Sequence, residues 1–317
     1  MKKLLLMLIA AGTGVLSLAG AEPLTIGCTT YPVWLLTREI TANVKNVRTE
    51  LLIPAGTGCP HDYVLTPADM RKLGTKNLLV VRNGLGLDDF VLKPLQKMNP
   101  KAPVLEVCRG LPVLYSECGH DHDHKHEDHD HDHDHEHGEH HHEHHAHPNP
   151  HLFASPDMAR GIVANIAEGL CRADSANAAA YRKNAAELDR KLRGLTDEMA
   201  QLKESVRGKS IVVQHGVFDY LARALELKTA AAIQSEGTAP SAAAMLKLVK
   251  IIREHHVAVI FTEPQYSANN AKTLARECRI VVCQLDPLAG GPADPPRDHY
   301  VNVMRENLKK IRKVLVK

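Results

Sequence analysis

Short apolar segments alternate with helical segments twice along this 317-residue chain, and this alternation restricts the possible folds more than any other feature. The apolar runs are bounded by Gly, Pro or Asn, which is typical of short strands buried on both faces of a parallel sheet. A helix is expected from Pro67, with Thr66 as its N-cap. Strands are expected at 24–29, 47–53, 78–82 and 103–107 in the first half, and at 211–214, 228–233, 257–263 and 280–285 in the second.

A long helical segment at 175–206 separates the two halves and contains no Pro. Its apolar residues recur at spacings of three and four, which gives one apolar face. These residues are Leu188, Leu192, Leu195, Met199 and Leu202. At about 1.5 Å per residue the helix spans roughly 45 Å. The sequence predicts an α/β fold of two Rossmann-like lobes, at 22–174 and 207–317, each with a mainly parallel four-stranded sheet and joined by one long rigid helix.

The first 21 residues have the pattern of a secretory signal peptide. Lys2 and Lys3 precede an apolar run at 4–18, and Ala19-Gly20-Ala21 gives a small-x-small cleavage pattern. The run is too short for a secure membrane span, and no other apolar stretch approaches 18 residues. We therefore expect cleavage after residue 21, export of the mature chain and no stable membrane insertion.

Residues 120–147 form a low-complexity segment in which His alternates with Asp and Glu. It holds 15 of the 21 His, ten acidic residues and one Lys, so its formal charge is −9. Such a composition cannot bury a core, so a disordered loop is expected at 119–147. We expect this loop to bind several Zn²⁺ ions weakly and to pass zinc to a tighter site between the two lobes; an acidic solvating spacer is the alternative. Its histidines are His120, His122, His124, His126, His129, His131, His133, His135, His137, His140, His141, His142, His144, His145 and His147.

Four further side chains with metal-binding chemistry follow expected strands or turns. They are His61 after the second strand, His151 after the low-complexity segment, His215 after the fifth strand and Asp286 after the eighth. Taken alone, each is more often a loop or turn residue than a ligand. Together they put two donors on each lobe, at the strand ends where α/β folds bind ligands. Three imidazoles and one carboxylate suit Zn²⁺, so the sequence predicts a metal site between the lobes.

The segments around these residues also resemble a known family. PHDYVLTPADM, NPHLFASPDMA, QHGVFDYLARALEL and QLDPLAG are similar, in this order, to motifs of periplasmic zinc/manganese-type solute-binding proteins of ABC transporters. The resemblance covers essentially the whole chain after the signal peptide and is strongest to the high-affinity zinc uptake proteins. Asn149 stands where the family usually has Asp, and Gln214 and Gly216 are further departures.

The resemblance implies that the chain captures Zn²⁺ as a transported ligand rather than catalysing a reaction. It assigns the metal ligands to His61, His151, His215 and Asp286, and a His at position 215 favours zinc. It further implies docking on a membrane permease and, through it, coupling to an ATPase. We expect the protein to act as a monomer.

Other readings stay open beside this one. The same fold would serve as a manganese- or iron-binding component of such a transporter, or as a periplasmic zinc buffer or metallochaperone. No HExxH, P-loop, GxGxxG or GxSxG motif supports an enzyme, and aromatic residues at 4% with dispersed basic residues argue against nucleic acid. Near the site, Cys59 is interpreted as a structural or disulfide-forming residue rather than as a fifth ligand. Glu263 is interpreted as a partner of a ligand or as a residue that lines the space between the lobes.

Overall fold

The computed structural model describes residues 22–58, 60, 63–116, 147–234 and 240–316. The predicted signal peptide, Cys59 and the candidate ligand His61 lie outside the described residues. So do the low-complexity histidines at 120–145, whereas His147 lies within them.

The first half of the chain builds a four-stranded parallel sheet with the order β2-β1-β3-β4. All of β3 is buried, and four of its five side chains are apolar, which suits its central place in the sheet. Thr66 caps α2 through a capping box with Asp69, so this helix begins where the sequence predicts. The elements are β1 (Leu24–Cys28), α1 (Tyr31–Ile40), β2 (Val47–Leu51), α2 (Pro67–Leu73), β3 (Leu78–Arg82), α3 (Leu92–Met98), β4 (Val104–Glu106) and α4 (Pro156–Ala173).

The second half repeats this arrangement in a parallel sheet with the order β10-β9-β7-β8. Its elements are β7 (Ser210–Val213), α6 (Asp219–Ala224), β8 (Lys228–Ala232), α7 (Ala242–Glu254), β9 (Val259–Thr262), α8 (Asn269–Cys278) and β10 (Val281–Gln284). All eight predicted strands are present within two residues of their expected ends. The predicted fold class is therefore confirmed. A short antiparallel ladder of β5 (Tyr115–Ser116) and β6 (His147–Pro148) was not expected from the sequence.

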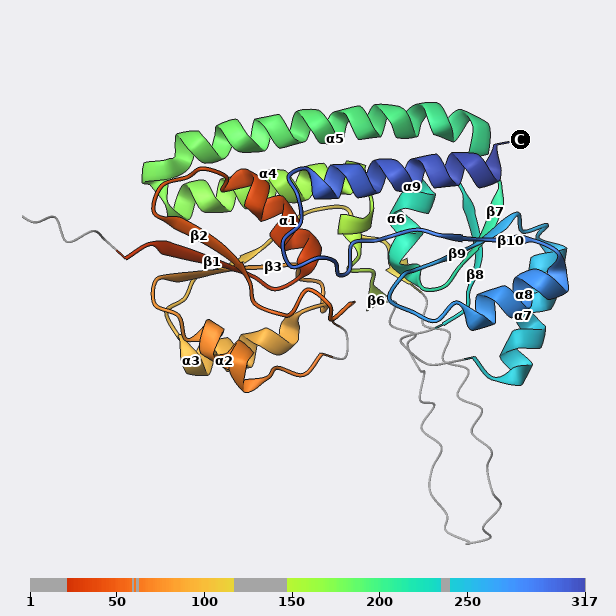
Figure 1. Cartoon of the computed structure of the whole chain (residues 1–317), viewed down its shortest axis with the longest axis horizontal. Coiled ribbons are helices and arrows are strands. Elements are labelled where there is room, and N and C mark those ends of the chain that lie inside the picture. The colour runs from red at the N-terminus through yellow and green to blue at the C-terminus, as the bar shows by residue number, and fades with distance from the viewer. Residues whose placement is uncertain (1–21, 59, 61–62, 117–146, 235–239, 317) are drawn as a thin grey trace, which may run out of the picture.

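The predicted long helix is α5 (Ala178–Val206), and it runs along both sheets (Figure 1). Its five predicted apolar residues are all buried. The chain also crosses between the sheets a second time, because α9 (His299–Leu315) starts beside the first sheet and lies along α5 (Figure 1). The segment before α9 is fixed there by hydrogen bonds from Tyr31 Oη to Pro292 O (2.9 Å) and from Gly291 N to Ala55 O (3.0 Å).

The main hydrophobic core is continuous across both halves. It joins residues of β1 and β3, such as Ile26, to residues of β7 and β9, such as Val213, through the buried faces of α4, α5 and α9. Each sheet also has one smaller core, which lies between the sheet and its outer helices. None of the helices in the described ranges is long and apolar enough to cross a membrane. The shared core gives the two sheets one common frame.

Candidate metal site

Two of the predicted ligands, His151 and His215, lie side by side at the junction of the two halves. Their ring centroids are 4.8 Å apart and the ring planes meet at 83°. His151 precedes the 3₁₀ turn Leu152–Ala154 that leads into α4, and His215 follows the end of β7 and precedes the turn Gly216–Phe218. His151 is buried, with 3% of its surface exposed. The fold thus brings together two imidazoles that are 64 positions apart in the chain.

Asn149 determines which ring nitrogen of His151 is available. Its Nδ2 donates hydrogen bonds to Gly216 O (2.8 Å) and to Asp219 Oδ2 (3.0 Å), so its Oδ1 is the acceptor end of the amide. That oxygen accepts from the backbone N of His151 (3.0 Å) and lies 2.9 Å from the ring Nδ1. Since Oδ1 can only accept, Nδ1 carries the proton and Nε2 keeps the lone pair that binds a metal.

Two tyrosines hold the segment that carries His151. The Tyr220 hydroxyl of α6 donates to Asn149 O (2.7 Å) and accepts from Leu114 N (3.0 Å). The Tyr300 hydroxyl of α9 donates to Phe153 O (2.6 Å). Because α6 and α9 follow α5, these bonds fix the segment from the other half of the chain.

Glu263 follows β9 and is completely buried next to His215. Its Oε1 lies 3.9 Å from His215 Nδ1, and its Oε2 accepts a hydrogen bond from Gln265 Nε2. Burial, and to a smaller extent the charge of Asp286, together raise the pKa of Glu263 to about 8. The candidate site therefore contains a carboxyl group whose charged form is disfavoured, because the surrounding residues do not fully compensate its loss of water.

Asp286, the predicted carboxylate ligand, is half-buried after β10. Its Oδ1 accepts from Leu288 N (2.8 Å), and its backbone is held by Asn307 of α9 through bonds of 2.9 and 2.7 Å. Burial raises the pKa of Asp286, while the Leu288 bond and the charge of His299 oppose this shift. His299, at the start of α9, is half-buried and meets the Tyr31 ring edge-on, with the ring centroids 6.5 Å apart.

Over the described ranges, no three His, Cys, Asp or Glu side chains form a group that could hold a metal ion. The histidine pair is the part of the predicted set that the structure brings together, and His61 lies outside the described residues. The four-ligand set therefore stays a prediction. Sequence reasoning missed the roles of Asp219 and Tyr220, although both lie in the QHGVFDY motif, and saw Asn149 only as a departure from the family pattern.

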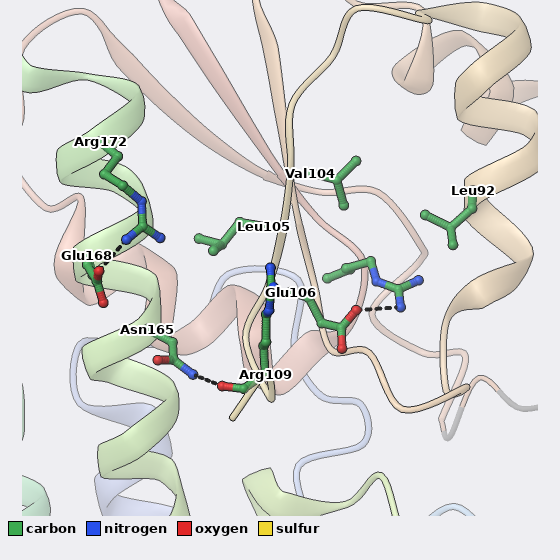
Figure 2. A pocket seen from close by; sticks show the side chains of 9 residues that line it. Leu92, Val104, Leu105, Glu106, Arg109, Asn165, Glu168 and Arg172 are labelled. Carbon is green, nitrogen blue, oxygen red and sulfur yellow. Dashed lines mark hydrogen bonds and ion pairs between the residues drawn. The ribbon is translucent and has the colours of Figure 1, made fainter. Parts of the chain in front are cut away.

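A separate pocket of about 870 Å³ opens at the edge of the first sheet (Figure 2). None of the residues that line it is a predicted ligand. Its carboxylates are already paired, Glu106 with Arg82 at 2.9 Å and Glu168 with Arg172. This pocket offers an ion no unpaired carboxylate, so the histidine pair remains the candidate site.

Comparison with known proteins identifies the family. The model described as ZnuA, zinc-uptake complex component A, periplasmic, matches residues 26–314. The chain belongs to this family. The high-affinity zinc uptake system protein ZnuA of Haemophilus ducreyi is 35% identical over 285 residues, which are 89% of each chain. The resemblance predicted from the four motifs is thereby confirmed.

Two further relatives extend the comparison. The zinc-binding lipoprotein AdcA of Streptococcus pneumoniae is 30% identical over 297 residues, which are 91% of this chain but 55% of AdcA. The chain therefore spans about half the length of that relative. Among solved structures, the SBP FpvC from Pseudomonas aeruginosa in complex with Mn²⁺ matches with a TM-score of 0.76 and 27% identity, covering 92% of this chain and 98% of FpvC.

Proposed function

We propose that this protein is the periplasmic zinc-binding component of an ABC importer. It captures Zn²⁺ at the junction of its two lobes and delivers the ion to a membrane permease. The observation that carries the proposal is the histidine pair, with one ring already in the tautomer that presents Nε2. Membership of the zinc-uptake family and the names of the ZnuA and AdcA relatives support it.

The proposed ligands are His61, His151, His215 and Asp286. Imidazole nitrogen is a preferred zinc donor, and Zn–N distances of about 2.0–2.1 Å are expected. Binding requires neutral imidazoles, so the affinity for zinc falls as the pH falls below about 6.5. The ion is cargo, and the protein acts by binding and release rather than by catalysis.

Zinc is favoured over manganese because the donors that the structure brings together are nitrogens. Mn²⁺ prefers carboxylate, carbonyl and water oxygens. The structure of FpvC with Mn²⁺ makes the manganese- or iron-binding component the second candidate. The low-complexity histidines are proposed to collect additional zinc weakly, and the chain is proposed to act as an exported monomer after removal of 1–21.

Competition titration of the full chain against a chromophoric zinc chelator tests the proposal. One tight zinc site is expected above a set of weak sites, and manganese should not displace the tightly bound ion. His151→Ala and His215→Ala should each abolish the tight site and leave the weak ones. His255→Ala is the matched control, because His255 is the exposed C-cap residue of α7. At a free zinc concentration 100 times the Kd, the tight site should stabilise the fold by about 2.7 kcal/mol.

Three outcomes would contradict the proposal. A tight site that survives the loss of both histidines would place zinc elsewhere in the chain. Tighter binding of manganese than of zinc would favour the second candidate. A chain with weak sites alone would be a zinc buffer rather than the binding component of an importer.

A further inference from the structure

Glu263 is a buried carboxyl group for which the fold itself gives no structural reason. It follows β9, which lies between β7 and β10, so it sits between the strand that leads to His215 and the strand that leads to Asp286. No part of its surface is exposed, and among the described residues Oε1 has no hydrogen-bond partner. Burying a carboxylate without full pairing costs several kcal/mol, so such groups are generally kept for function.

The geometry places this oxygen on one side of the His215 ring. Oε1 lies 3.9 Å from Nδ1, which is too long for a hydrogen bond but within reach of a small side-chain rotation. Both atoms are shut off from solvent. An incoming ion therefore has access to the ring through Nε2 rather than through the space between Nδ1 and Glu263.

We propose that Glu263 is the positioning residue for His215: it accepts the Nδ1–H hydrogen bond when a divalent ion binds Nε2. This inference rests on the proposed function. Metal-bound histidines generally donate their second ring nitrogen to a carboxylate or carbonyl, which fixes the tautomer and strengthens the ligand. Gln265 already holds the other oxygen of Glu263, so Oε1 is the one left to accept.

The two histidines then differ in how they are prepared for the ion. His151 has its partner in place, since Asn149 Oδ1 lies 2.9 Å from its Nδ1. His215 has a carboxylate held 1 Å farther away and must move to reach it. In this assignment His151 is oriented before the ion binds. His215 is oriented by Glu263 when the ion binds.

Variants of Glu263 in the full chain test this assignment. Glu263→Ala should weaken zinc binding by about 10–100-fold, and Glu263→Gln should recover part of the loss because its amide oxygen still accepts a hydrogen bond. Glu106→Ala is the matched control: Glu106 is a carboxylate at the end of β4, pairs with Arg82 and lies in the pocket of Figure 2, away from the histidine pair. Thermal unfolding of each metal-free variant checks that it is folded.

Nitrogen NMR of the zinc-loaded chain measures directly which ring nitrogen of His215 carries the proton and which binds the metal. In the unaltered chain His215 should carry its proton on Nδ1 and its metal on Nε2, with slow exchange of the Nδ1 proton. Exchange should become faster in both Glu263 variants, and this readout serves even if the Ala variant fails to fold. Zinc bound at Nδ1, or equal zinc affinity and proton exchange in the unaltered chain and the variants, would overturn the inference. Failure of the unaltered chain to bind zinc would instead reject the proposed function.

Discussion

Replacing Asn149 with Ala removes a side chain that bonds to both histidine-bearing segments. Asn149 is 4% exposed and its side chain makes four hydrogen bonds, two to His151 and one each to Gly216 and Asp219. The alanine leaves four groups without this partner: the amide and the ring Nδ1 of His151, which are buried, and the Gly216 carbonyl and the Asp219 carboxyl, which are half-buried. Each of the two buried groups costs about 1–3 kcal/mol when unsatisfied, so we expect a loss of about 2–6 kcal/mol in the free energy of unfolding.

The assay is urea unfolding of the metal-free chain at pH 7, with Asn165→Ala as the control. Asn165 is also an amide of the first half, but it makes two bonds, to Val107 O and to Arg109 O, at the edge of a pocket open to water (Figure 2). Its loss should cost about 1 kcal/mol. Zinc affinity should fall by about 10–100-fold in Asn149→Ala alone. Equal stability of the two variants, or unchanged zinc affinity in Asn149→Ala, would refute the reasoning.

Three further predictions address the frame around the site. The hydrogen bond from Arg160 holds the pKa of Asp189 below its ordinary value of 3.8, so Asp189→Asn should lower the free energy of unfolding by less than about 1 kcal/mol at pH 7. That deficit should shrink as the pH falls below 3.8, which urea unfolding at pH 7 and pH 3 measures. Gly290→Ala places a methyl group 2.5 Å from a main-chain oxygen and should cost about 1–3 kcal/mol in thermal unfolding, whereas Gly194→Ala, with open space around it, should stabilise α5. Tyr300→Phe leaves a buried carbonyl unpaired and should cost about 1–2 kcal/mol in urea unfolding.

Most of the strands could be predicted because they are short apolar runs between chain-breaking residues, although β2 (Val47–Leu51) carries Arg48 and Glu50 within it. A strand buried on both faces carries mainly apolar side chains, and β3 shows this at 78–81, with the buried Arg82 at its end. The two-residue ladder of β5 and β6 could not be predicted, since so short a pair has no periodicity. The packing of α9 along α5 was also not predicted. The amphipathic pattern of α9 indicates that one face is buried, but not which neighbouring element buries it.

The candidate site was predictable in part, because its metal-binding side chains follow predicted strands or turns. His151 and His215 lie side by side because the end of β7 and the start of the turn before α4 lie at the same junction. The sequence could also mark Glu263 as a residue near a ligand. It could not show the hydrogen bonds of Asn149 to Gly216 and Asp219, which join segments about 70 positions apart. Such contacts depend on distances in space, and no local pattern encodes them.

The same contacts bear on how an ion is captured. Asn149 and Tyr220 bond the His151 segment to the second half of the chain, and Tyr300 adds a third bond from α9. With α5 and α9 both running along the two sheets and one core shared between them, separating the lobes would break all of these contacts at once. Moving the His215 ring toward Glu263 breaks none of them. For zinc at the proposed site, the energetics therefore favour capture by side-chain adjustment at a preformed junction over closure of the lobes around the ion.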